Sequence, residues 1–274
     1  FYRCRLERAD FSQATLEEAS FVESHVQQAD LSGANLDRAT FFRSDLTQTR
    51  LAMLRMDRAT VAESKLAQTD FTGAVLSFVT MYKLDLSTAI FAGMQADSVI
   101  FLECDLTRQV FAGLTLQRCQ FTDSRMDGAD FRNATLTQSN FKGASLLNAD
   151  FSGAAAAQTI FAEADLGEAN CRGGRFEQSI WVDAKLQGTA FDDAFLPLSV
   201  FHRARANGAV FRRAELQDAD FSYADLSGAD MSGAHFFRTR FHRAIQQGAR
   251  ISARGGIIEN DPELHKAQAW SDSP

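Results

Sequence analysis

The chain has 274 residues, a formal net charge of −7 and a hydrophobic fraction of 45%. No run of about 18 consecutive apolar residues occurs, which excludes a membrane-spanning helix. The acidity is mild, and no amino-terminal signal peptide is visible.

A large apolar residue returns at every fifth position from Phe1 to Ile251 without an insertion or deletion. These 51 positions include 20 Phe and 18 Leu, and Gln246 is the polar one among them. Two residues before each of them the chain is nearly always small, as at Ala9, Ala14 and Ala19. A short fixed period of this kind predicts a repeat architecture.

A period of five fits neither the 3.6-residue repeat of a helix nor the two-residue repeat of a strand. It fits a backbone that turns a corner every five residues and points each large side chain at a common axis. Four sides close a square coil of 20 residues, so the register predicts about 13 coils in residues 1–254. Coils about 4.8 Å apart make a rod of roughly 60 Å. We expect one all-β domain with a continuous core.

Two further patterns support the coil of 20 residues. Charges of alternating sign recur every 20 residues on the outside, as expected for stacked neighbours: Arg3, Glu23, Arg43, Glu63, Lys83 and Glu103. Inside, Phe and Leu alternate every five residues, which predicts two Phe sides opposite each other with Leu sides between them. Met94 beside Ala96 indicates compensation of volume.

Runs such as Ala29-Asp30-Leu31-Ser32-Gly33 and Ala224-Asp225-Leu226-Ser227-Gly228 resemble the pentapeptide-repeat family, whose motif is A(D/N)Lxx. The resemblance covers about 250 residues and implies a right-handed quadrilateral parallel β-helix. Bulkier residues replace the small one mainly in the middle of the chain, where they put the local coil shape in question: Leu54, Val79, Leu84, Met94, Val99, Gln109 and Leu114.

The two ends differ. Phe1 is already in register, and because a solenoid end needs a cover, we expect further sequence before it in a larger bacterial protein. After residue 254 the repeat stops, and residues 255–274 are predicted to be a cap or tail. Asp261-Pro262 reads as a helix start, with a disordered tail as the alternative. Family members often dimerise end to end, which implies roles in a cap or homodimer for Ile257, Ile258, Leu264 and Trp270.

The sequence gives no catalytic set. The recurring Asp before each corner and Gly after it are explained by turns. His202 and His242 lie two coils apart, roughly 10 Å, too far to ligate one metal directly. The cysteines, unpaired and inward in the repeat, favour a reducing compartment: Cys4, Cys104, Cys119 and Cys171. We expect no enzyme activity, no cofactor, no metal, and a cytoplasmic location or secretion by a non-Sec route.

One outer side carries a stripe of apolar residues over the first six coils. Its candidate partner-binding residues are Tyr2, Val22, Phe42, Tyr82, Ile100 and Leu102. Ordinary β-propensity and a protein-binding surface explain this stripe about equally well. In the second case the alternating charges beside it form a charged rim.

These observations favour a non-enzymatic scaffold or adaptor with protein partners and without direct nucleic-acid or membrane binding. The alternative, implied by the quinolone-resistance branch of the family, is a DNA mimic that binds DNA gyrase. Mimicry needs a dense negative surface, whereas nine Arg and five acidic residues lie between Phe201 and Arg254. Residues 259–264 resemble the tails of family members linked to type VI secretion.

Overall fold

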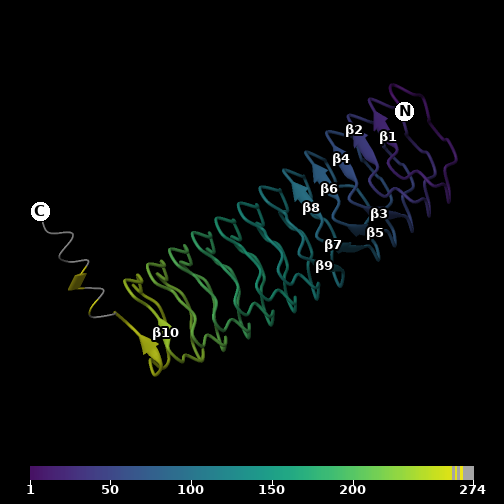
Figure 1. The fold of residues 1–274 in the computed structure, drawn as a ribbon. Coiled ribbons are helices and arrows are strands. Elements are labelled where there is room, and N and C mark those ends of the chain that lie inside the picture. Colours follow the sequence, from purple (N-terminus) through teal and green to yellow (C-terminus); the bar gives the residue numbers. More distant parts are fainter. Residues whose placement is uncertain (261–262, 264–265, 268–274) are drawn as a thin grey trace, which may run out of the picture.

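The computed structural model describes residues 1–260, 263 and 266–267. They form a parallel β-solenoid of about 12 turns, one fewer than the register predicts. Figure 1 shows a straight stack with the amino terminus at one end and the last described turns at the other. Backbone pairing joins residues 20 apart, from Tyr2 with Val22 to Asp230 with Arg250. Every turn therefore consists of four pentads. The sides centred on Phe1, Leu6, Phe11 and Leu16 are numbered 1, 2, 3 and 4.

Regular strands occupy two sides of the first six turns. Side 1 holds the five-stranded sheet β1-β2-β4-β6-β8, and side 4 holds the four-stranded sheet β3-β5-β7-β9. A pair of strands, β10 and β11, lies at the carboxyl end. The bounds are β1 Ser20–Val22, β2 Thr40–Phe42, β3 Arg55–Asp57, β4 Thr60–Ala62, β5 Val75–Ser77, β6 Thr80–Tyr82, β7 Gln95–Asp97, β8 Ile100–Leu102, β9 Thr115–Gln117, β10 Thr239–Arg240 and β11 Ile257–Ile258.

Each corner depends on one residue in the left-handed region of backbone space. From Arg3 to Gly248 every fifth residue has a positive φ, whether it is Gly, Gln, Arg or Glu. Within this described range the exception is Thr88, whose branched Cβ disfavours positive φ. Asp or Asn before the corner stabilises the turn, as where Asp30 Oδ1 accepts the Ser32 N–H at 2.9 Å.

The core is a column of stacked rings. Phe101, Phe121 and Phe141 lie parallel on side 1, with centroids 5.0 and 4.7 Å apart. Phe131 and Phe151 on side 3 stack in the same way at 4.7 Å, and they meet the first column edge to face. Edge-to-face and offset-parallel contacts are the favoured geometries of aromatic pairs. The predicted arrangement of two Phe sides around a common axis is confirmed.

Volume is compensated where the pattern changes. Cys171 stands at a Phe position on side 3, and Phe176 fills the space from side 4, where Leu is usual. The residue two before it is Gly174, and a Cβ there would lie 2.4 Å from the Phe176 ring. Met94 and Ala96 are likewise both buried, at 1% and 2% exposure, as the sequence predicts.

Polar side chains in the inward small position bind the backbone of the preceding turn. The hydroxyls of Thr49 and Thr69 donate to the carbonyl oxygens of Val26 and Leu46 at 2.9 and 3.0 Å. Gln109, one of the bulky departures, donates from its side-chain amide to two carbonyls, those of Leu86 and Ala89, at 2.6 and 2.9 Å. Buried polar groups in the core are therefore satisfied without altering the coil.

The last strand breaks the 20-residue spacing. Thr239 pairs with Ile257 and Arg240 with Ile258, an offset of 18 residues. Ile257 packs against the core, whereas Ile258 is 43% exposed. Leu264 and Trp270, and most of the helix predicted around them, lie outside the described residues. No helix in the described part of the chain is long and apolar enough to cross a membrane.

Candidate interaction surfaces

The apolar stripe predicted from the sequence is one continuous column on side 1. Backbone pairing stacks its members directly, each 20 residues from the next: Tyr2, Val22, Phe42, Ala62, Tyr82 and Leu102. Tyr2 is 61% exposed, Ala62 is buried at 9%, and the other four are half-buried. Phe42 and Tyr82 therefore flank a position where the side chain is a single methyl group. We call these six residues the apolar stripe.

A second column runs beside the apolar stripe on the same sheet. It consists of Ser20, Thr40, Thr60, Thr80 and Ile100, and all five are uncharged. Ile100, a predicted binding residue, is half-buried and pairs with Thr80. Side 1 therefore presents an uncharged sheet surface that is one column wide at the first turn and two columns wide over the next five.

The alternating charges form ion pairs along the corner next to the apolar stripe. Arg3 Nε lies 2.7 Å from Glu23 Oε2, Arg43 Nε lies 2.8 Å from Glu63 Oε2, and Lys83 Nζ lies 3.7 Å from Glu103 Oε2. We call these six residues the charged ladder. The hydrogen bond from Arg3 to Glu23 raises the pKa of the guanidinium, and the Tyr82 hydroxyl, with Glu103 adding to it, raises the pKa of Lys83.

Each cation of the charged ladder also covers an aromatic ring of the apolar stripe. The Arg3 and Arg43 guanidinium carbons lie 4.9 and 4.7 Å from the ring centroids of Tyr2 and Phe42. Lys83 Nζ lies 4.9 Å from the Tyr82 ring. These distances are those of cation–π contacts. Sequence reasoning missed them, although the aromatic residue directly before each cation was a usable signal.

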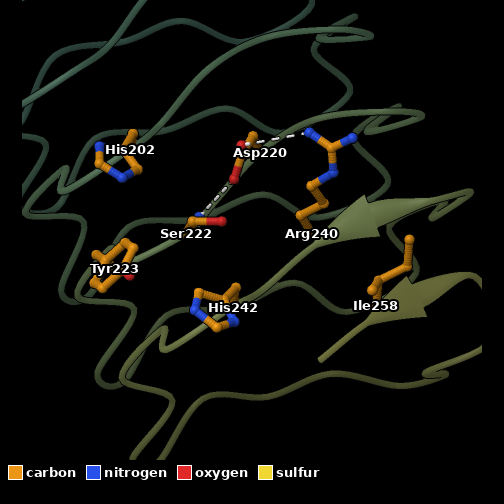
Figure 2. A pocket seen from close by; sticks show the side chains of 7 residues that line it. All are labelled: His202, Asp220, Ser222, Tyr223, Arg240, His242 and Ile258. Carbon is orange, nitrogen blue, oxygen red and sulfur yellow. Dashed lines mark hydrogen bonds and ion pairs between the residues drawn. The ribbon is translucent and has the colours of Figure 1, made fainter. Parts of the chain in front are cut away.

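A cavity of about 460 Å³ lies near the carboxyl end of the rod, on the same side, and its lining begins at His202, 100 residues beyond Leu102. Figure 2 shows its lining, which comes from the last coils and β11: His202, Asp220, Ser222, Tyr223, Arg240, His242 and Ile258. The Tyr223 ring meets the rings of His202 and His242 edge to face, with centroids 5.2 and 5.5 Å apart.

The chemistry of this cavity is limited by contacts that its groups already make. Asp220 Oδ1 accepts the Ser222 N–H at 2.8 Å, and Asp220 Oδ2 lies 3.8 Å from Arg240. His242 is buried at 4% exposure. Among the described residues no group of three His, Cys, Asp or Glu side chains is placed to hold a metal ion. The sequence did not predict this cavity, because it depends on β11.

Family comparison agrees with the geometry. The family model described as pentapeptide repeats (8 copies) matches residues 1–38, 19–52, 55–93, 182–218 and 214–249, which together exceed half of the chain. A second model, described as a pentapeptide repeat region, matches residues 94–171. The chain belongs to the pentapeptide-repeat family. No curated protein sequence matches it.

Several solved structures are similar to this one, among them two of pentapeptide-repeat proteins, HetL and Rfr23. HetL from the cyanobacterium Nostoc sp. strain PCC 7120, involved in heterocyst differentiation regulation, is 22% identical with a TM-score of 0.29, over 85% of this chain and 90% of HetL. QnrB1, a plasmid-mediated fluoroquinolone resistance protein, is 14% identical with a TM-score of 0.29, over 92% and 96%. Rfr23 from the cyanobacterium Cyanothece 51142 is 18% identical with a TM-score of 0.17, over 58% and 88%.

The four thiols of this pentapeptide-repeat protein differ in access. Cys104, Cys119 and Cys171 are buried and Cys4 is half-buried, all four as free cysteines. Burial raises the pKa of Cys104 and of Cys119 to about 12, and it also raises that of Cys171. Because the thiolate is the reactive form, the three buried thiols are protected from modification both by their burial and by a raised pKa that keeps them protonated.

We expect a thiol reagent at pH 8 to modify one cysteine of the folded protein quickly and the other three at least about 100-fold more slowly. The measurement is the time course of thiol modification with and without urea. The Cys4→Ser variant should lack the fast phase. A fast phase of two or more thiols in the folded protein would contradict the burial of the three core cysteines.

Proposed function

We propose that this protein is a non-enzymatic scaffold rod that binds a protein partner through side 1 of its first six turns. The observation that supports this most is the uncharged surface formed by the apolar stripe and the second column beside it. The charged ladder borders this surface. An apolar centre with a charged edge is the usual composition of a protein interface. The aromatic rings and arginines of the stripe and ladder are residue types enriched among binding hot spots.

The test compares two variants with the same change in charge. Phe42→Glu with Tyr82→Glu places two carboxylates in the apolar stripe. Ile90→Glu with Val110→Glu places two on the opposite side, where both side chains are exposed, at 49% and 60%. We expect the stripe variant to capture its partner from native cell extract at least about tenfold less than the unaltered chain. The control variant should capture it normally, and equal capture by the stripe variant would refute the proposed site.

The alternative, mimicry of DNA toward gyrase, has less support. A DNA mimic presents unpaired negative charge, but several carboxylates near the carboxyl end are paired with arginine. Asp183 with Arg203, Asp193 with Arg213, and Asp218 with Arg238 form contacts of 2.7, 2.6 and 2.6 Å. Inhibition of gyrase supercoiling by micromolar protein would reverse this ranking. A link to type VI secretion rests on residues 259–264 alone and stays a prediction.

A further inference from the structure

The apolar stripe and the charged ladder share a repeat of two turns. In the first, third and fifth turns an aromatic ring stands beside a cation: Tyr2 with Arg3, Phe42 with Arg43, Tyr82 with Lys83. In the second, fourth and sixth turns a smaller aliphatic residue stands beside a glutamate: Val22 with Glu23, Ala62 with Glu63, Leu102 with Glu103. The two classes of turn are complementary in both size and charge.

An even number of alternating turns has a geometric consequence. Two rods packed side 1 against side 1 can be related by a two-fold axis that lies in the interface, perpendicular to the rods. This axis reverses the order of the turns and keeps each column opposite itself. The first turn then faces the sixth, the second faces the fifth, and the third faces the fourth. Each aromatic-and-cation turn therefore meets an aliphatic-and-glutamate turn.

We propose that the occupant of side 1 is a second copy of this chain, bound antiparallel over the first six turns, which rests on the proposed function of that surface. Arg3 faces Glu103 of the second copy, Glu23 faces its Lys83, and Arg43 faces its Glu63. Two parallel copies would be related by an axis along the rods, which brings the charged ladder of each copy opposite the other edge of side 1 in its partner, so the ladder would not meet its complement.

The side-chain sizes fit the same arrangement. Phe42 of one copy stands opposite Ala62 of the other, the buried position between two half-buried rings. Tyr82 stands opposite Val22, and Tyr2 opposite Leu102. Large side chains therefore meet smaller ones at all six levels, as close packing at an interface core requires.

The rest of side 1 is compatible with this contact. The second column brings Thr40 opposite Thr60 of the other copy, with no charge on either. At the edge of side 1 away from the charged ladder, Arg38 of one copy faces Arg58 of the other. Each arginine is paired with carboxylates of its own chain: Glu17 and Glu18 contact Arg38, and Asp57 lies 2.5 Å from Arg58. The positive charges are therefore compensated within each chain.

The alternation of the two classes of turn ends after the sixth turn, where the proposed contact also ends. One turn beyond Leu102 and Glu103 the same two columns hold Thr122 and Asp123, and the next turn holds Lys142 and Gly143. Six turns span about 29 Å, and a face of that length buries on the order of 600 Å² per copy. This is the lower end of specific interfaces, so dimerisation should depend on concentration in the micromolar range.

The test is the mass of the full 274-residue chain by sedimentation equilibrium between about 1 and 200 μM. We expect the mass to rise from 30.2 kDa toward twice that value. Arg43→Glu alone places like charges opposite each other at the two central levels, and Glu63→Arg alone does the same with the opposite sign. Each single variant should dimerise at least about tenfold more weakly. Mixed together, the two variants present opposite charges at all six levels and should form a heterodimer.

The matched control is the pair Asp193 and Arg213, which are also 20 residues apart at a corner but lie outside side 1. Asp193→Arg and Arg213→Glu should leave the mass unchanged. Circular dichroism confirms that each variant is folded. A dimer that Arg43→Glu and Glu63→Arg do not weaken would overturn the proposal, as would single variants whose mixture stays monomeric.

A chain that is monomeric at 200 μM would also overturn the second copy as the occupant. The proposed function is then judged separately, because the capture experiment with Phe42→Glu and Tyr82→Glu detects a different protein on the same surface. Loss of capture in that variant with a monomeric parent chain would retain the binding surface and reject the dimer. Unchanged capture would reject the surface itself.

Discussion

The Trp181→Ala substitution is expected to lower the free energy of unfolding by about 3–5 kcal/mol, the usual range for truncating a buried large aromatic residue. Trp181 is fully buried at 0% exposure. Its ring stacks between those of Phe161 and Phe201, with centroids 4.1 and 5.6 Å away. Its indole N–H donates to Ser179 Oγ at 2.6 Å. Alanine removes both stacking contacts and leaves a cavity that the rigid turns on either side cannot close.

The matched control is Trp181→Phe, because Phe is the residue that dominates this column. The smaller ring keeps the stack but loses the bond to Ser179, whose hydroxyl still lies 3.0 Å from Ser199 Oγ. We expect a loss of about 1–2 kcal/mol, well below that of alanine.

Urea unfolding followed by circular dichroism measures both variants. Turns of a solenoid contact only their neighbours, so a single two-state transition is not guaranteed. Amide hydrogen exchange should therefore accelerate most in residues 160–202 and least around Phe41. Uniform acceleration along the rod, or equal losses for alanine and phenylalanine, would contradict this account.

Acidification should selectively weaken the carboxyl-terminal turns through Asp230. Hydrogen bonds from the Ser232 hydroxyl and N–H, with Arg212 and Arg250 at 2.9 and 3.0 Å, lower the pKa of Asp230 from 3.8 to about 2. A lowered carboxyl pKa stabilises the fold fully above the ordinary value and loses that contribution as pH falls through the folded value. The contribution of about 2 kcal/mol should therefore disappear between about pH 4 and pH 2.

Asp230→Asn tests this assignment. The variant should be less stable than the parent by about 2 kcal/mol at pH 7, and most of this difference should be gone near pH 2, where the folded parent's carboxylate is about half protonated. Asp225→Asn is the control, because Asp225 occupies the equivalent corner one side earlier and accepts the Ser227 N–H at 2.9 Å. It should cost less than about 1 kcal/mol. A difference between Asp230→Asn and the parent that stays constant from pH 7 to pH 2 would contradict the role given to this carboxylate.

The inside of the rod was predictable from sequence because one period determines it. Once a corner follows every five residues, the inward direction of Phe131 and Leu136 is fixed, and so is the pairing of residues 20 apart. The same geometry placed Tyr2, Val22 and Phe42 in one outward column. None of these inferences needed side-chain detail.

Other features depended on contacts that a period does not encode. The positive φ of Gln28 or Arg38 follows from the turn geometry rather than from the residue type. The contact of Arg43 with the Phe42 ring depends on one of several rotamers that the Arg43 side chain can adopt. At the carboxyl end, β11 pairs with an offset of 18 instead of 20, so this pairing and the cavity near His242 could not be derived from the repeat.

Since all four sides share a single apolar register, the effect of an insertion depends on its length. Five extra residues leave every downstream Phe and Leu pointing inward but rotate the following part of the rod by a quarter revolution. Each surface column before the insertion is then continued by the residues of a different side after it. Twenty extra residues lengthen the rod by one layer without rotation. One or two extra residues, by contrast, put the downstream Phe and Leu out of register and expose them to water. Length variation in relatives should therefore occur in fives and twenties, and the twenties should preserve any binding face that crosses the junction.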